Sequence, residues 1–73
     1  MDTALVTVGQ RIKELREARG WTQEGLGDRV RVTGIAVSRW ERGVFIPDAT
    51  HRKRLARVLG VPRGTFDPEE PAA

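Results

Sequence analysis

The sequence predicts an all-α fold, a compact bundle of about five short helices. Glycines and prolines divide the 73 residues into segments of helical length. Within these segments the apolar residues recur at intervals of three and four, which is the period of a helix face. Cysteine is absent, so a buried apolar core has to hold the fold without disulfides. A chain of this length is expected to form one domain.

The first helix is predicted from Val8 to Arg19. Thr7 and Gln10 form a Thr-x-x-Gln arrangement, in which the hydroxyl and the amide can each bond a backbone group at the start of the helix. Gly20 can end the helix in the left-handed conformation. The predicted apolar face consists of Val8, Ile12 and Leu15.

Two shorter helices are predicted next, within residues 22–30 and 34–42. Thr22 and Thr33 are suited to cap them, because a threonine hydroxyl accepts a hydrogen bond from the first turn. Gly25 and Gly27 weaken the earlier helix by about 1 kcal/mol each. We interpret Gly27 as a place where another helix comes close, with a glycine merely tolerated by packing as the alternative. The inward residues are predicted to be Leu26, Val30, Val37 and Trp40.

A fourth helix is predicted between Asp48, as its cap, and Gly60, and Pro62 opens a last short helix that returns Phe66 to the core. The inward residues of the fourth helix are predicted to be Leu55, Ala56 and Leu59. The chain is thus divided into an N-terminal arm (1–7), a folded domain (8–66) and a flexible acidic tail (67–73).

The charge is unevenly distributed. Residues 8–63 hold all 13 Lys and Arg residues but only six acidic residues, an excess of seven positive charges, against +3 for the whole chain. A basic folded part favours a polyanion as partner. The longest apolar run near the start is far below the ~20 residues of a membrane span, so we expect a cytoplasmic protein without a membrane partner.

Residues for catalysis are not apparent. The sequence has no Cys-His pair and no glycine-rich phosphate loop, and its acidic residues are scattered. We therefore expect no enzyme, no cofactor and no small-molecule substrate. His51 is the only histidine, and without cysteine it does not predict a metal site.

Four spaced segments resemble one known family. Residues 8–16, 20–26, 37–43 and 55–61 read VGQRIKELR, GWTQEGL, VSRWERG and LARVLGV. In this order they closely resemble the Xre/Cro family of phage-repressor-like helix-turn-helix proteins, over about residues 8–66. The resemblance implies a lambda-repressor-like DNA-binding fold with its helix-turn-helix at 22–42. It also implies a small transcriptional regulator, a repressor or activator that binds double-stranded DNA sequence-specifically, as a homodimer on an inverted repeat.

The resemblance also implies which residues contact DNA. The helix over residues 34–42 would enter the major groove, where Arg39 can fork onto guanine and Ile35 can touch a thymine methyl group. A core or dimer-interface position is the alternative for Ile35. Gln23, at the start of the helix before, would hold a phosphate together with the helix amides. The base-reading positions are Gly34, Ile35, Ser38 and Arg39, and the phosphate-binding positions are Thr22, Gln23, Arg42 and Arg11.

The chain departs from the family at several positions. Gly34 has no side chain with which to read a base, and Arg31 occupies a turn position where glycine is usual and a left-handed backbone costs ~1 kcal/mol. Arg16 and Glu41 match a family pair that forms a buried, structural salt bridge. The loop Val44-Phe45-Ile46 is apolar where relatives often carry basic residues, and Arg52 replaces an inward leucine.

Two interpretations of that loop stay open. Phe45 or Ile46 could fold over the space that Arg52 leaves, as part of the core. Alternatively, Val44, Phe45 and Ile46 could form an exposed apolar patch for dimerisation or for another protein. The second interpretation also supports a different function, a protein-interaction module of the same fold, antitoxin-like or coactivator-like, that binds through this loop or through the Leu5-Val6 arm.

Overall fold

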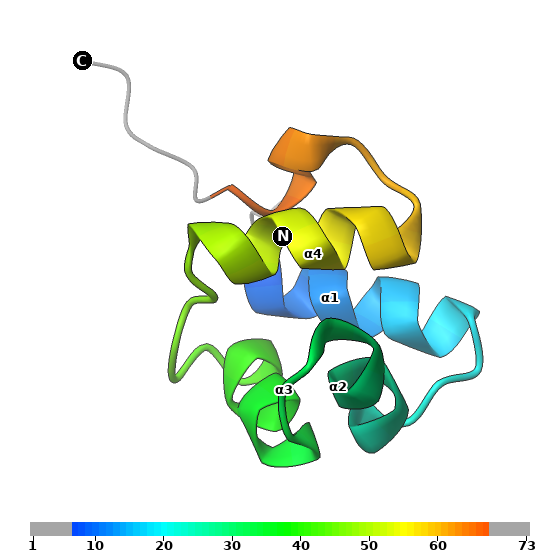
Figure 1. Ribbon diagram of the computed structural model, residues 1–73. Coiled ribbons are helices and arrows are strands. Elements are labelled where there is room, and N and C mark those ends of the chain that lie inside the picture. The colour runs from blue at the N-terminus through cyan, green and yellow to red at the C-terminus, as the bar shows by residue number, and fades with distance from the viewer. Residues whose placement is uncertain (1–6, 68–73) are drawn as a thin grey trace, which may run out of the picture.

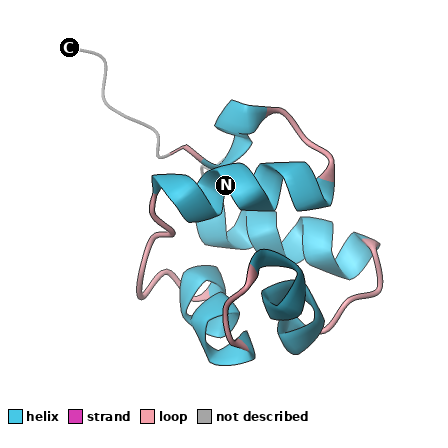
Figure 2. Ribbon diagram, in the orientation of Figure 1, coloured by secondary structure: helices cyan, strands magenta, loops and turns pink. Residues whose placement is uncertain are grey.

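The computed structural model describes residues 7–67. This part of the chain contains helices and loops and no strand (Figures 1 and 2). The elements are α1 (Val8–Ala18), α2 (Gln23–Val30), α3 (Gly34–Glu41), α4 (Ala49–Leu59) and the single-turn 3-10 helix η1 (Arg63–Phe66). The prediction of an all-α bundle of about five short helices is confirmed.

The start of α1 is closed by reciprocal hydrogen bonds. The backbone nitrogen of Gln10 donates to the Thr7 hydroxyl at 3.1 Å, and the backbone nitrogen of Thr7 donates to the Gln10 side-chain oxygen at 3.1 Å. At the other end, Gly20 has a φ of 72°, which a residue without Cβ adopts at little cost. Both ends of α1 are therefore determined by residues that the sequence identifies.

Helices α2 and α3 are joined by a tight turn. Threonine hydroxyls cap both helices, since Thr22 accepts from Gly25 at 2.9 Å and Thr33 accepts from Ala36 at 3.1 Å. Arg31 has a φ of 67° in the left-handed region, as expected. A methyl group at Gly27 would lie 2.6 Å from the carbonyl oxygen of Val32. A close approach at Gly27 is confirmed, but the prediction of another helix as its partner is wrong, because the neighbouring backbone is that of Val32 and Thr33 in the turn before α3.

All five elements contribute to one core. Helix α2 packs on α3 and α4, α1 packs on α3 and η1, and α4 packs on η1 (Figure 1). Each element presents its predicted apolar face to the centre, and Val8 and Leu15 of α1 pack at the edge as partly buried residues. The buried apolar side chains are Ile12, Leu26, Val30, Val37, Trp40, Leu55, Ala56, Leu59 and Phe66.

The C-terminal part also follows the prediction, with one difference. Asp48 caps α4 by accepting from the His51 amide at 2.9 Å, and Phe66 is fully buried. Asp67, which the sequence places in the tail, accepts a hydrogen bond from Arg52 at 3.3 Å. The other tail residues and the Leu5-Val6 arm lie outside the described residues.

Two further findings concern residues 7–67. None of their helices is long and apolar enough to cross a membrane. Within the same range, no three His, Cys, Asp or Glu side chains come together in a group that could hold a metal ion.

Candidate nucleic-acid interface

One face of α3 is directed to solvent. Ile35 is 64% exposed, Arg39 is exposed and Ser38 is half-buried, whereas Val37 and Trp40 on the opposite face are buried. Positions three and four apart share a helix face, so the three outward side chains form one surface. The exposure of Ile35 excludes the core, one of the two alternative places considered for it, and leaves a dimer interface open.

The first residue of α3 lies against the start of α2. A methyl group at Gly34 would lie 3.1 Å from the backbone nitrogen and from the Cα of Glu24. These distances leave little room for a side chain, which is a physical reason for glycine at this position. The close approach also keeps the beginning of α2 beside the exposed face of α3.

The start of α2 carries the first two predicted phosphate ligands. Thr22 is exposed, and its oxygen accepts from Gly25 while its hydroxyl proton is left for another acceptor. Gln23 is half-buried, and its Nε2 donates to Oε1 of Glu41 at 3.0 Å. An amide nitrogen has a second N–H, so this contact fixes the side chain and leaves a donor beside the unpaired amides of the helix start.

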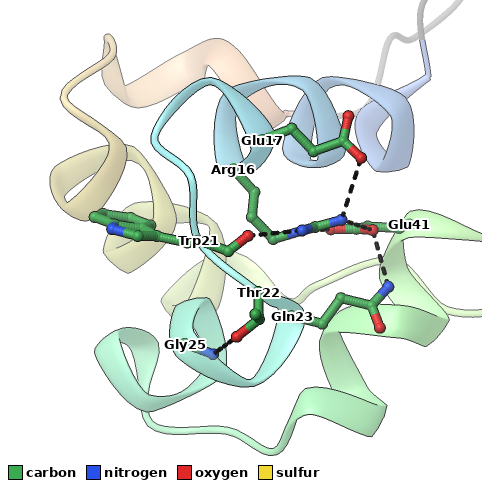
Figure 3. A network of polar contacts seen from close by, with 7 residues as sticks. All are labelled: Arg16, Glu17, Trp21, Thr22, Gln23, Gly25 and Glu41. Carbon is green, nitrogen blue, oxygen red and sulfur yellow. Dashed lines mark hydrogen bonds and ion pairs between the residues drawn. The ribbon is translucent and has the colours of Figure 1, made fainter.

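Arg16 and Glu41 form the expected ion pair between α1 and α3 (Figure 3). Arg16 Nε lies 2.6 Å from Glu41 Oε2, and Nη2 lies 3.0 Å from Oε1. The two side chains are 10% and 4% exposed. A third donor of the guanidinium, Nη1, bonds the carbonyl oxygen of Trp21 at 2.8 Å. The hydrogen bonds with Glu41 raise the pKa of Arg16 further above its ordinary value, so the guanidinium of Arg16 stays charged.

This network joins three segments of the fold. Glu41 accepts hydrogen bonds from Arg16 of α1 and from Gln23 of α2, and Arg16 also donates to the Trp21 carbonyl in the loop between α1 and α2 (Figure 3). The pair therefore orients the start of α2 relative to α3. In this way a structural ion pair determines the position of a predicted phosphate ligand.

The last two predicted phosphate ligands differ. Arg42 is exposed at the C-cap of α3. Arg11 is half-buried, and its Nη1 donates to the carbonyl oxygen of Thr65 in η1 at 3.1 Å. The structure thus brings Arg42 together with α3 and gives Arg11 a partner in η1.

The apolar loop is exposed. Val44 and Phe45 are each 56% exposed and Ile46 is 60% exposed. The prediction that Phe45 or Ile46 covers a space at Arg52 is wrong, because Arg52 is itself half-buried and donates to the Pro47 carbonyl at 2.7 Å. Beside the loop lies an apolar hollow of about 300 Å³ lined by Thr7, Val8, Gly9, Trp40, Gly43, Phe45, Ile46 and Pro47.

Sequence reasoning missed two features of this region. A methyl group at Gly9 would overlap the carbonyl oxygen of Trp40 and lie 2.7 Å from that of Glu41, so Gly9 permits contact between α1 and the end of α3. A glycine in the first turn of an amphipathic helix is the available signal for such a contact. The other feature is the ring of Phe45 near Arg39, which no sequence pattern indicates.

These features define a helix-turn-helix protein. Two short helices meet at a tight turn, and the second helix presents Ile35, Ser38 and Arg39 to solvent. This arrangement is used to place a helix in the major groove. The helix-turn-helix family model matches residues 12–66. The chain belongs to this family and has the lambda-repressor-like fold of phage-repressor-like transcriptional regulators.

Curated relatives carry related descriptions. The chain is 34% identical over 59 residues to the HTH-type transcriptional regulator DicA of Escherichia coli. The matched region covers 81% of this chain and 44% of DicA. It is 33% identical over 55 residues to Multiprotein-bridging factor 1 of Schizosaccharomyces pombe, and this match covers 75% of this chain and 37% of that protein. The chain therefore spans less than half the length of either relative.

Solved structures with the same fold include complexes with DNA. The P22 c2 repressor in complex with a synthetic operator matches with a TM-score of 0.78 and 28% identity, over 82% of this chain and 91% of the repressor chain. SinR, the master regulator for biofilm formation, in complex with DNA matches with a TM-score of 0.75 and 28% identity, over 82% of this chain and 97% of the SinR chain.

Proposed function

We propose that the chain binds double-stranded DNA sequence-specifically as a small transcriptional regulator, with α3 in the major groove. The observation that carries this proposal is the two-sided character of α3. Val37 and Trp40 anchor the helix in the core, while Ile35, Ser38 and Arg39 are left on the side away from it. Exposure of an isoleucine next to an arginine on a short, rigidly packed helix suits a surface that meets another molecule.

The outward side chains of α3 have complementary tasks. The Arg39 guanidinium presents the planar fork that matches O6 and N7 of guanine, a contact worth about 1–3 kcal/mol of discrimination. Ile35 offers an apolar surface to a thymine methyl group, and Ser38 can bond a base or a phosphate. Since Gly34 contributes no side chain, base recognition is narrow and part of the specificity comes from DNA shape.

Phosphate binding falls to the start of α2 and the end of α3. Helix N-termini bind phosphates through unpaired amides and a partial positive charge, and Thr22 and Gln23 add side-chain donors there. Arg42 adds a full positive charge at the other end of α3. The excess of basic residues over residues 8–63 strengthens the attraction without adding specificity.

A homodimer on an inverted repeat is the arrangement that we propose. One helix of eight residues with three outward side chains reads few base pairs, and two copies double the site. In a two-fold dimer the recognition helices lie about 34–36 Å apart, which places half-sites about 10 base pairs apart centre to centre. The exposed loop formed by Val44, Phe45 and Ile46 offers apolar surface for contact between copies.

A second candidate function is a protein-interaction module. The same exposed loop favours it, because three neighbouring apolar side chains more than half exposed are a costly feature unless something covers them. The relatives named Multiprotein-bridging factor 1 and SinR, the latter matched in a SinR/SinI complex, give this candidate further support. In this case the loop carries the function and α3 does not.

Selection from a random library of duplexes tests the first function. The purified chain is mixed with the library at about 0.15 M salt, and the retained duplexes are sequenced. An enriched inverted repeat with half-sites near 10 base pairs supports the proposal, and affinity for it should fall steeply between 50 and 200 mM salt because phosphate contacts release counterions. A folded chain that enriches no sequence contradicts the first function and favours the second.

A further inference from the structure

Phe45 lies against the arginine to which we assign guanine recognition. The guanidinium carbon of Arg39 is 5.9 Å from the centroid of the Phe45 ring and over its face. Both residues are exposed, with Phe45 at 56%. The contact thus belongs to the surface of the molecule, on the side where α3 meets solvent, and it is not a product of core packing.

The backbone holds the loop in the place that this contact needs. Gly43 has a φ of 78° and donates to the Trp40 carbonyl at 3.1 Å. Two successive backbone amides then donate to the backbone carbonyl oxygen of Arg39, that of Val44 at 2.9 Å and that of Phe45 at 3.4 Å. The aromatic residue is therefore tied to the main chain of the residue whose side chain it faces.

Arg39 differs from Arg16 and Arg29, two arginines whose guanidinium groups have partners within the protein. Arg16 is bound to Glu41, and Arg29 donates to the Gly25 carbonyl at 3.0 Å while stacking on Trp21. For Arg39, no ion pair and no side-chain hydrogen bond is found within residues 7–67. Among the described residues the N–H groups of Arg39 thus have no partner, which leaves them available to a ligand.

We propose that Phe45 is a positioning residue for Arg39 and thereby a determinant of DNA specificity, an inference that rests on the proposed function. An aromatic face attracts a guanidinium through its quadrupole and leaves the N–H edge of the guanidinium free. A carboxylate partner would instead occupy the donors that have to reach guanine. Phe45 thus limits the freedom of Arg39 before DNA binds without competing with the base.

The first test measures the pairing in the free protein by NMR. The Arg39 side-chain protons should show a ring-current shift in the wild-type chain that is lost in Phe45→Leu and kept in Phe45→Tyr. Val44→Ala is the matched control, since Val44 has the same exposed fraction and precedes Phe45 in the same loop. Equal Arg39 shifts in the wild type and in Phe45→Leu would overturn the pairing.

The second test measures recognition. The variant Arg39→Ala first identifies the guanine that Arg39 reads, as the position where the preference for guanine is lost. Dissociation constants are then compared for the selected duplex and for a duplex with adenine at that position. Phe45→Leu should reduce the guanine preference by about two- to fivefold, which is the strength of an exposed cation–π contact. Phe45→Tyr should keep the preference, and Phe45→Leu should change nothing further in the Arg39→Ala background.

The outcomes separate the inference from the function on which it rests. A guanine preference that depends on Arg39 but is unchanged in Phe45→Leu overturns the positioning role alone. Equal weakening on both duplexes also overturns it, because Phe45 would then act on affinity and not through Arg39. A wild-type chain that prefers neither duplex overturns the proposed function, and the positioning role with it.

Discussion

Removal of the Glu41 carboxylate is expected to destabilise the fold strongly. In Glu41→Ala the Arg16 guanidinium, whose side chain is 10% exposed, loses two hydrogen bonds of 2.6 and 3.0 Å and keeps its charge. Gln23 loses its acceptor as well. Leaving one member of a buried pair unpaired costs about 3–5 kcal/mol.

The expected shift in melting temperature follows from the size of the domain. A change of 1 kcal/mol moves the Tm of such a domain by about 4–8 °C, so Glu41→Ala should lower it by about 12–40 °C. A domain of this length has about 4–11 kcal/mol of stability in total. The variant should therefore be close to unfolding at 37 °C. The measurement is thermal unfolding followed by far-UV circular dichroism.

The protein offers a matched control for this experiment. Glu17 also lies near Arg16, at 3.8 Å, but its side chain is 57% exposed. An exposed pair contributes less than about 1 kcal/mol, so Glu17→Ala should lower the Tm by less than about 4–8 °C. The double variant Arg16→Met/Glu41→Leu should regain much of the loss, since it removes both buried charges. A Glu41→Ala variant that melts within about 4 °C of the wild type would refute the reasoning.

Three further predictions concern other positions. Gly9→Ala should lower the Tm, with a cost of about 1–3 kcal/mol for a forced separation of helices, whereas Gly64→Ala, whose methyl group would meet Asp67 at an ordinary 3.5 Å, should be tolerated; equal melting of the two variants would exclude a close contact at Gly9. Hydrogen bonding from the His51 backbone amide lowers the pKa of Asp48 below its ordinary value. The stability from its charged form is accordingly present above about pH 4 and lost as the pH falls through the folded pKa, and Asp48→Asn, which keeps a capping oxygen, should show a weaker acid dependence of Tm than the wild type. Phe45→Ser should melt near the wild type because the ring is 56% exposed, and a large loss of Tm would place the ring in the core after all.

Helix bounds and core were predictable because their determinants are local. Thr7, Thr22, Thr33 and Asp48 each cap the helix that begins at the next residue. The inward faces follow from spacing within single segments, and this is also why Leu55, Ala56 and Leu59 were identified. The predicted ion pair of Arg16 with Glu41 came from a family pattern, since the sequence separates these residues by 25 positions.

The features that were not predictable depend on contacts between segments distant in sequence. Arg11 meets Thr65 across 54 positions, and no periodicity indicates this bond. The steric role of Gly34 depends on how near the starts of α2 and α3 come to each other. The exposure of Ile35 and of the apolar loop depends on what the rest of the chain covers, and hydrophobic side chains alone do not reveal it.

The central claim is that the exposed face of α3 contacts DNA bases, and a pair of charge reversals tests it most directly. Arg39→Glu and Arg57→Glu change the net charge equally, and both arginines are exposed, but Arg57 lies on α4. Dissociation constants for the selected duplex are measured at about 0.15 M salt. We expect Arg39→Glu to abolish specific binding and Arg57→Glu to weaken it modestly, through the general field alone. Equal losses in the two variants, or intact specific binding by Arg39→Glu, would contradict the claim.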